Sequence, residues 1–410
     1  MNNSISSPKI TRLILSHNIF IFGRSIFDLF FSLFIWNTTD SLPILASFLL
    51  TRIATHMIGF SIFAPLAKRG KPYVSRTISL LGLAISYLII LILADSIINH
   101  IILVATAVGF FNGIYWISYL VMQFDLTNIE NRGNYNGTNI AAKTAALILG
   151  PLVGGVAIQL NLFNLGYNII FILGAISYTT SLFVGYIKFK PITNDSFHIV
   201  NSLKKISRNK DIVKLMIGRF FGNFGYKGAL ERLLPIFLFE TLQSEIQTGG
   251  LISLFSVTAI VTTFIIGKYT KRSKYSQIVT LGGSLFFIST LSLIGVPSII
   301  TYIIYGFSRE ILLPLLEIPV KVHRDNLLHL IPEHKKHRVE YIVIREWIYV
   351  FGSRSLGYGL LFFVDDLSGN TLQIILALMA FSILIETLIV RNIRYKNPTT
   401  EEQEPELSKI

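Results

Sequence analysis

Lysine and arginine are distributed very unevenly between the polar gaps of this chain, and this asymmetry constrains its fold more than any other feature. Twelve apolar runs, each long enough to cross a bilayer, are separated by short gaps. Alternate gaps contain no lysine or arginine at all, and they lie at 37–43, 95–100, 161–167, 240–248, 297–298 and 365–370. Because basic loops stay on the cytoplasmic side of a membrane, the sequence predicts twelve crossings with both termini in the cytoplasm.

The composition supports a membrane protein. The 410 residues are 52% hydrophobic and only 14% charged, whereas soluble domains carry roughly 25% charged residues. The net charge of +13 comes from clusters beside apolar runs, where they meet anionic headgroups rather than nucleic acid. The absence of cysteine excludes thiolate metal sites and thiol nucleophiles. We therefore predict a multi-pass protein of the cell membrane, in contact with membrane lipids.

The apolar runs predict helices, because strand-like alternation is absent and helices satisfy their own backbone groups in lipid. A crossing needs roughly 20 residues, and the expected spans are 11–36, 42–66, 76–94, 101–124, 141–160, 168–189, 212–239, 249–267, 278–296, 299–320, 341–364 and 372–390. Similar basic turns follow the second and eighth spans. The predicted fold is an all-α membrane protein with two pseudo-symmetric six-helix bundles at 1–189 and 211–396, a cytoplasmic linker at 190–210 and a cytoplasmic tail at 397–410.

Two short motifs resemble those of the major facilitator superfamily, and the resemblance extends over the whole chain. In the turn after the second span, Lys68, Gly70 and Lys71 fit the superfamily pattern Gly-x-x-x-Asp-Arg/Lys-x-Gly-Arg/Lys, but Phe63 and Ala67 replace its glycine and aspartate. The fifth span contains Gly150-Pro151-Leu152-Val153-Gly154-Gly155, which is similar to the Gly-Pro-x-x-Gly-Gly motif of antiporters. The resemblance implies a transporter, while the glycines alone are also compatible with close helix packing.

A closer resemblance is to the YqgE-type group of bacterial transporters. It rests on the stretch Asn131 to Gly137 before the fifth span and on Arg338 to Glu346 at the start of the eleventh. Phe111 to Trp116 adds to it. The resemblance strengthens the fold prediction and implies no particular substrate.

Charged residues inside spans are candidates for function, because each costs roughly 2.5–3.5 kcal/mol in the membrane. In the first span Arg24 and Asp28 are four residues apart, as are Arg52 and His56 in the second. The Arg24–Asp28 pair is interpreted either as an internally neutralised packing element or as a substrate or proton site. His56 is either a proton carrier or a hydrogen-bonding packing residue.

The fourth span offers a polar and aromatic stripe with Asn112, Trp116 and Tyr119, which suits the wall of a cavity for an amphipathic solute. The seventh span is the most polar and carries Arg219, Asn223, Lys227, Glu231 and Arg232. Lys227 and Glu231 are predicted to pair along one helix. The tenth span adds Arg309 and Glu310. All these residues are candidates for binding substrate or protons.

Further residues are candidates for gating. Prolines are expected to kink or break the cytoplasmic end of the tenth span, and charged residues near the membrane surface are expected to form salt bridges, except that Arg338 is interpreted as a solvated helix end. The gating candidates are Lys68, Gly70, Lys71, Asp125, Arg132, Gly150, Pro151, Gly154, Gly155, Pro314, Glu317, Arg345 and Glu346. The histidines between 323 and 337 fit no zinc motif, so no metal site is predicted.

The sequence lacks a phosphate-binding loop and the usual hydrolase motifs. We therefore expect no enzyme activity and no cofactor. The predicted function is secondary active transport by alternating access, coupled to protons, with a small amphipathic or hydrophobic compound as the exported substrate. A lipid flippase and a non-transporting receptor or scaffold are the alternatives. The protein is expected to be a monomer.

Overall fold

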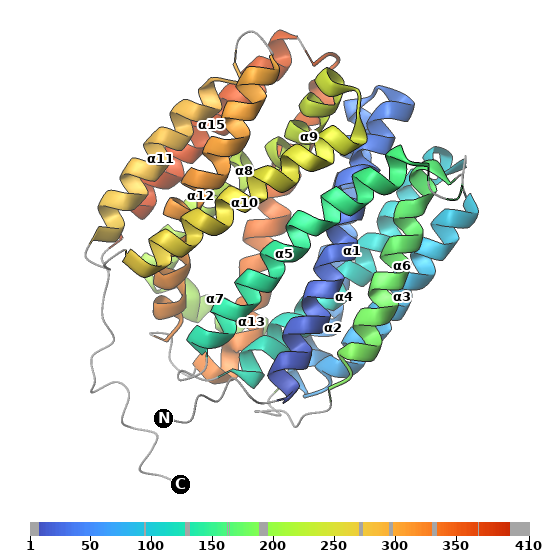
Figure 1. The fold of residues 1–410 in the computed structure, drawn as a ribbon. Coiled ribbons are helices and arrows are strands. Elements are labelled where there is room, and N and C mark those ends of the chain that lie inside the picture. Colours follow the sequence, from blue (N-terminus) through green and yellow to red (C-terminus); the bar gives the residue numbers. More distant parts are fainter. Residues whose placement is uncertain are drawn as a thin grey trace, which may run out of the picture.

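The structure is a computed structural model, and it describes residues 8–93, 96–127, 132–161, 163, 165–187, 196–269, 274–294, 298–329, 334–367 and 369–393. All regular elements among these residues are helical, so the predicted all-α fold is confirmed. Most of the helices run side by side along the length of the molecule (Figure 1).

The first half of the chain forms one group of helices. Within it α1 packs against α5 and α6, α2 against α4, and α3 against both α4 and α6. Short 3₁₀ turns at Ile98–His100 and Gly166–Asn168 precede α4 and α6. The bounds are α1 Pro8–Thr39, α2 Leu42–Lys68, α3 Pro72–Leu93, α4 Ile101–Leu126, α5 Arg132–Gln159 and α6 Ile169–Val184.

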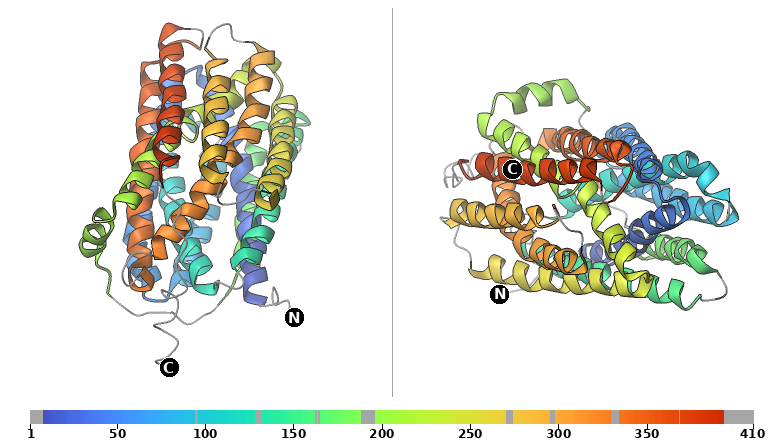
Figure 2. Two further views of the ribbon diagram at one scale, coloured as in Figure 1. Left: turned by 90° about the vertical axis from the view of Figure 1, so that its left-hand side faces the viewer. Right: turned by 90° about the horizontal axis from the view of Figure 1, so that it is seen from above.

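The second half forms a second group, which lies beside the first when the molecule is seen from above (Figure 2). Here α15 packs against α8 and α11, while α12 packs against α10 and α11. A π-helical turn at Trp347–Gly352 separates α13 from α14, and a 3₁₀ turn follows at Leu361–Phe363. The bounds are α7 Ile199–Ser207, α8 Lys210–Gly225, α9 Ala229–Leu242, α10 Glu245–Tyr269, α11 Tyr275–Leu291, α12 Ile299–His329, α13 His334–Glu346, α14 Ser353–Leu360 and α15 Asn370–Val390.

Nine helices within the described residues are long and apolar enough to cross a membrane, and the apolar α11 is shorter. The predicted seventh and eleventh spans are interrupted, the seventh at Tyr226–Gly228 and the eleventh at the π-helical turn. The count of twelve crossings and the domain boundaries stay predictions. Residues 190–195 of the predicted linker and the whole predicted tail at 397–410 lie outside the described residues.

Side chains at helix starts explain two of the boundaries. The Ile44 amide donates to the Ser41 hydroxyl before α2, and Pro43 lies in the first turn. Before α8, the Asn209 side chain accepts from the amides of Asp211 and Ile212. Both caps satisfy amides that have no partner within their own helix. Ser41 and Asn209 therefore fix where these spans begin.

The tenth span differs from its prediction. The helix α12 is continuous through Pro314 and Pro319, so a break at its cytoplasmic end is wrong, while the expected kink stays a prediction. A proline costs only the local hydrogen bond when neighbouring helices hold the chain in place. The interruption instead occurs at Tyr226–Gly228 between α8 and α9.

Glycines let the two halves approach closely where α5 meets α10. A Cβ atom on Gly154 would lie 2.5 Å from the Phe30 ring of α1, so this glycine faces the first half. A Cβ on Gly155 would lie 2.8 Å from the Glu245 carbonyl oxygen, and one on Gly249 would lie 2.5 Å from that of Pro151. The glycine motif of the fifth span is therefore a packing element on two faces.

This contact leads to a prediction with a neighbouring control. Gly249→Leu is expected to lower the thermal stability of the purified protein, because the new side chain meets backbone that cannot move aside. Overpacking of this kind costs about 1–3 kcal/mol. Gly250→Leu is the control, since a Cβ there meets nothing within 4 Å. Equal unfolding temperatures for the two variants would contradict the close approach of α5 and α10.

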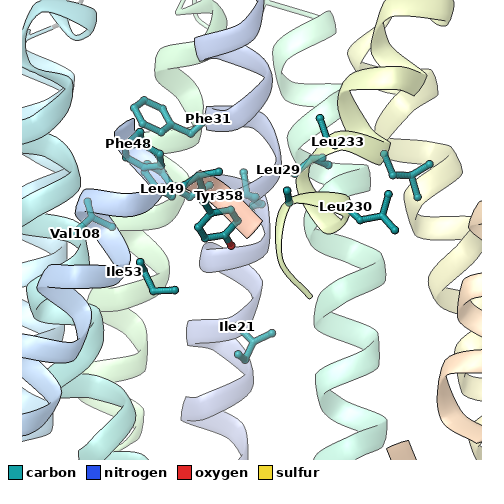
Figure 3. Packing of buried hydrophobic residues seen from close by; sticks show 14 of the residues in the cluster. Ile21, Leu29, Phe31, Phe48, Leu49, Ile53, Val108, Leu230, Leu233 and Tyr358 are labelled. Carbon is teal, nitrogen blue, oxygen red and sulfur yellow. The ribbon is translucent and has the colours of Figure 1, made fainter. Parts of the chain in front are cut away.

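Apolar side chains from both halves lie around α1 (Figure 3). Phe31 of α1 packs on Phe48 of α2, with ring centroids 4.9 Å apart. Leu230 and Leu233 of α9 belong to the same buried cluster, together with Tyr358 of α14. Both halves therefore contribute to the apolar layer around α1.

Candidate functional site

One carboxylate of α1 forms ion pairs with three arginines from three helices. Asp28 accepts from Arg24 Nε at 3.2 Å, from Arg52 Nη2 at 2.5 Å and from Arg232 Nη2 at 3.4 Å. Arg232 Nη1 also donates to the Asp28 carbonyl oxygen at 2.9 Å. Because Arg232 comes from α9, Asp28 joins the two halves of the molecule.

Aromatic rings cover the cations of this cluster. The Arg24 guanidinium lies 5.3 Å from the Trp116 ring centroid, and that of Arg52 lies 5.8 Å from the rings of Phe27 and Phe48. Such contacts stabilise a cation where water is scarce. The predicted Arg24–Asp28 pair is confirmed, while the sequence did not reveal that Arg52 and Arg232 share its carboxylate.

A second ionic cluster lies within the C-terminal half. Arg219 of α8 donates to Glu386 at 2.9 Å and to Glu317 at 3.2 Å. Lys227 pairs with the same Glu317, and Arg219 also donates to the Tyr226 hydroxyl at 2.6 Å. Asn223 donates to the Arg219 carbonyl. Glu386 was missed by the sequence analysis, although a glutamate inside the last apolar run was its visible signal.

The predicted Lys227–Glu231 pair is wrong. Spacing by four residues brings side chains together only along a continuous helix, and the chain leaves helical geometry between these two residues. Lys227 turns to Glu317 instead. Within the described residues Glu231 forms no ion pair, and Arg309 pairs with its neighbour Glu310. Glu231 nevertheless lies within electrostatic range of Lys227, Arg232, Arg309 and Arg354.

Two further cations of the interior were not singled out from the sequence. Lys143 of α5 lies within electrostatic range of Arg24, Glu231 and Glu317. Arg354 of α14 lies within such range of Glu231 and His56. Neither cation forms an ion pair in the part of the chain that the structure describes. The signal in the sequence was their position inside apolar runs.

The aromatic stripe of α4 is largely a packing element rather than a cavity wall. The Tyr119 ring stacks on His17 with centroids 3.5 Å apart. The Tyr119 hydroxyl forms a hydrogen bond with the Tyr135 hydroxyl and accepts another from the Asn139 side-chain amide. Asn112 is likewise buried. Trp116 keeps some accessible surface beside Arg24. The predicted cavity lining is therefore wrong for Tyr119 and Asn112. In α2, His56 is half-buried and its ring stacks on that of Phe60.

A buried ion pair links the two halves at the predicted cytoplasmic end. Lys68 Nζ lies 2.5 Å from Glu340 Oε1, and their side chains are 1% and 0% exposed. Glu340 also accepts from the His198 amide at 2.9 Å, and Lys68 donates to the Ser196 carbonyl at 2.8 Å. Glu340 thus supplies the carboxylate that the turn after α2 lacks. Gly70 has a φ of 81° there, which favours glycine, and Lys71 is exposed.

A second ion pair reinforces this end. Arg338 donates to both Asp125 oxygens at 2.8 and 2.9 Å with both side chains buried, so its interpretation as a solvated helix end is wrong. Arg345 and Glu346 pair with each other rather than with Asp125. The Arg132 side chain lies outside the described residues. We name Lys68, Glu340, Arg338 and Asp125 the cytoplasmic lock.

The described residues contain no group of three or more histidines and carboxylates arranged to hold a metal ion. His337 meets Ser202 and Lys205 of α7, and His323 lies on α12. The side chains of His329 and His334 lie outside the described residues.

Comparison with known proteins identifies the family. The model of the Major Facilitator Superfamily matches residues 13–316, most of the chain. The chain belongs to the major facilitator superfamily. It is a membrane transporter of that type and no enzyme, as predicted from its motifs.

Two bacterial relatives have no assigned function. The "Uncharacterized protein YqgE" of Bacillus subtilis (strain 168) is 22% identical over 324 residues, which cover 79% of this chain and 75% of the relative. The "Uncharacterized protein in sodM 3'region" of Geobacillus stearothermophilus is 23% identical over 150 residues, or 37% of this chain and 70% of the relative. The predicted resemblance to the YqgE-type group is confirmed.

Solved structures agree on the fold. A bacterial homologue of the iron transporter ferroportin in an inward-facing state has a TM-score of 0.67 and is 13% identical, covering 93% of this chain and 97% of its own. The human organic anion transporter MFSD10 has a TM-score of 0.64 at 13% identity, covering 93% and 99%. A bacterial metal transporter has a TM-score of 0.60 at 13% identity, covering 93% and 97%.

Proposed function

We propose that this protein is a secondary active transporter that works by alternating access and couples transport to protons. The observation that carries the proposal is Asp28, which binds arginines of its own half and Arg232 of the other half. In a carrier, substrate binding must change the relative stability of two arrangements of the halves. A charged centre shared by both helix groups allows this, because a substrate that binds there alters the contacts between them. The remaining proposals are residence in the cell membrane, cytoplasmic termini and a monomeric state.

Alternating access requires contacts between the halves that break at one end and form at the other. The cytoplasmic lock supplies such contacts at one end. Toward the opposite end, Trp36 Nε1 donates to Glu240 at 2.5 Å and the Tyr167 hydroxyl donates to Glu245 at 2.8 Å. All of these are side-chain contacts that hydration can replace. We therefore propose that the halves rock about the Asp28 region between them.

Proton coupling is proposed for the interior carboxylates, foremost Glu231. Asp28 and Glu310 have cationic partners, whereas Glu231 has none among the described residues. Neighbouring cations hold such a carboxylate in its ionised form, and it can take up a proton when a bound anion neutralises those cations. Protonation of Glu231 would then change the balance of charge between the halves.

The test places the full chain in liposomes, applies a proton gradient and follows internal pH with a dye while candidate solutes are added. Glu231→Gln is expected to remove solute-dependent proton movement, and Asp28→Asn and Glu310→Gln are measured beside it. Asp40→Asn is the control, because Asp40 is exposed in the turn between α1 and α2 and its positive φ of 46° suits asparagine. Unchanged proton movement in all three interior variants would contradict proton coupling.

The fold does not select the substrate, because the similar structures are named for iron, for metal and for organic anions. We keep export of a small amphipathic compound as the proposal, with Trp116 as an apolar contact. Lipid flipping would use Arg24, Arg219 and Arg309 for the headgroup, but each of these arginines already pairs with a carboxylate. That pairing favours a soluble substrate over a lipid.

A further inference from the structure

We infer that the transported compound is an anion, and that Lys143 and Arg354 hold its negative group between the two halves. The inference rests on the proposed transport function and adds the substrate class to it. Three observations carry it, namely the charge balance of the interior, the position of Lys143 and the position of Arg354.

The interior of the spans contains more cations than carboxylates. When the charges near the ends of the spans are set aside, the nine cations are Arg24, Arg52, Lys143, Arg219, Lys227, Arg232, Arg309, Arg345 and Arg354, and the six carboxylates are Asp28, Glu231, Glu310, Glu317, Glu346 and Glu386. Positive charge collected between low-dielectric walls attracts anions and repels cations. The balance therefore favours an anionic cargo and disfavours a metal cation.

Lys143 is placed to meet a substrate from the first half. Its side chain is exposed, yet it lies within electrostatic range of Glu317 on α12 and Glu231 on α9. An exposed lysine on the outer, lipid-facing side of α5 would be remote from both glutamates. Lys143 therefore faces the space between the halves, where its ammonium remains accessible.

Arg354 is placed to meet the same group from the second half. It lies on α14, directly after the π-helical turn, and within electrostatic range of His56, Lys227 and Glu231. Its Nε is buried and has no hydrogen-bond partner among the residues that the structure describes. A guanidinium with an unused buried donor is costly until an acceptor arrives, and a carboxylate, sulfonate or phosphate offers bidentate acceptors.

Lys143 and Arg354 share Glu231 as a neighbour, because both cations lie within electrostatic range of it. The seven other interior cations bind Asp28, Glu310, Glu317, Glu346 or Glu386. Among these nine, Lys143 and Arg354 are the two that an incoming anion can engage without breaking an ion pair between described residues. Because they belong to different halves, the bound anion would connect the halves.

The test measures binding to the purified full-length protein by calorimetry with three probes that share one ring. They are benzenesulfonate, benzenesulfonamide and benzyltrimethylammonium. The anion is expected to bind at least about 10-fold more tightly than the other two. Lys143→Gln and Arg354→Gln are each expected to lower the affinity for the anion by about 10-fold and to leave the affinities for the other probes unchanged. Lys9→Gln is the control, since Lys9 is exposed at the start of α1.

Competition separates two sources of the negative group. If short-chain dihexanoyl phosphatidylglycerol displaces benzenesulfonate and inorganic phosphate does not, the anion is a lipid headgroup, whereas displacement by phosphate indicates a soluble anion. Both results support the inference. Tighter binding of the cation or the amide, or an absence of binding by all three probes, would overturn it. The proton-movement test with Glu231→Gln is independent of these probes, so it decides the transport function separately.

An unaltered affinity for benzenesulfonate in both Lys143→Gln and Arg354→Gln would also overturn the assignment. Lys143→Arg, which keeps the positive charge, is expected to retain most of the affinity for benzenesulfonate that Lys143→Gln loses. Thermal unfolding of each variant checks that the fold persists, and the exposure of Lys143 makes loss of folding an unexpected result.

Discussion

Asp28→Asn is expected to abolish transport and to lower the stability of the protein more than any other single change to its interior. The carboxylate is the common anion of Arg24, Arg52 and Arg232, and the amide leaves three guanidinium groups close together with no negative charge. Removing one member of a buried ion pair costs about 3–5 kcal/mol. Since three cations depend on Asp28, the loss lies at the upper end of that range.

The effect is measured by thermal unfolding in detergent and by solute flux in liposomes. Asp40→Asn again serves as the control. Arg24→Gln is expected to do less damage, because the carboxylate keeps Arg52 and Arg232. A wild-type unfolding temperature together with normal flux in Asp28→Asn would refute the role of Asp28 as the link between the halves.

Glu340→Gln is expected to open the predicted cytoplasmic end. Lys68 and Glu340 are almost completely buried, so the neutral amide leaves an ammonium without a counter-charge, again at about 3–5 kcal/mol. The structure can relieve this cost by separating α13 from α2, which hydrates Lys68. The apolar cluster around Met57, Val121 and Val343 separates at the same time.

Cysteine labelling detects this opening cleanly because the chain contains no cysteine. Val343→Cys, at a position 2% exposed, is expected to be protected from a water-soluble maleimide in the parent and to react in Glu340→Gln. Lys336→Cys, which is exposed, reacts in both backgrounds. Glu340→Asp, which keeps the negative charge that Lys68 and the His198 amide require, should retain more protection than Glu340→Gln. Continued protection in Glu340→Gln would show that the lock does not hold this end closed.

Local patterns were enough to predict the fold and the positions of its charges. Apolar runs separated by alternating basic gaps required a helical membrane protein, and glycines at 150, 154 and 155 indicated close packing. The Arg24–Asp28 pair followed from a spacing of four on a continuous helix. These features depend on neighbours in the sequence, so they could be read without tertiary structure.

The ionic network depends on tertiary contacts and could not be derived in the same way. Arg232 reaches Asp28 across 204 positions, and Glu340 reaches Lys68 across 272. The Lys227–Glu231 prediction failed because helix continuity was assumed through Gly225 and Gly228. Arg338 was taken as solvated because the sequence does not show that Asp125 lies opposite it. Charges inside spans pointed to members of the ionic network, but their partners came from the packing, and their role in transport stays a prediction.

Distances between spin labels at the two ends test alternating access most directly. One pair, Arg69→Cys with Lys336→Cys, spans the halves at the predicted cytoplasmic end, and the other, Asn37→Cys with Gln243→Cys, spans them at the opposite end. All four positions are exposed. Introducing Glu340→Gln is expected to lengthen the first distance and shorten the second. If both distances remain unchanged, or both lengthen together, the two halves do not alternate and the carrier mechanism is contradicted.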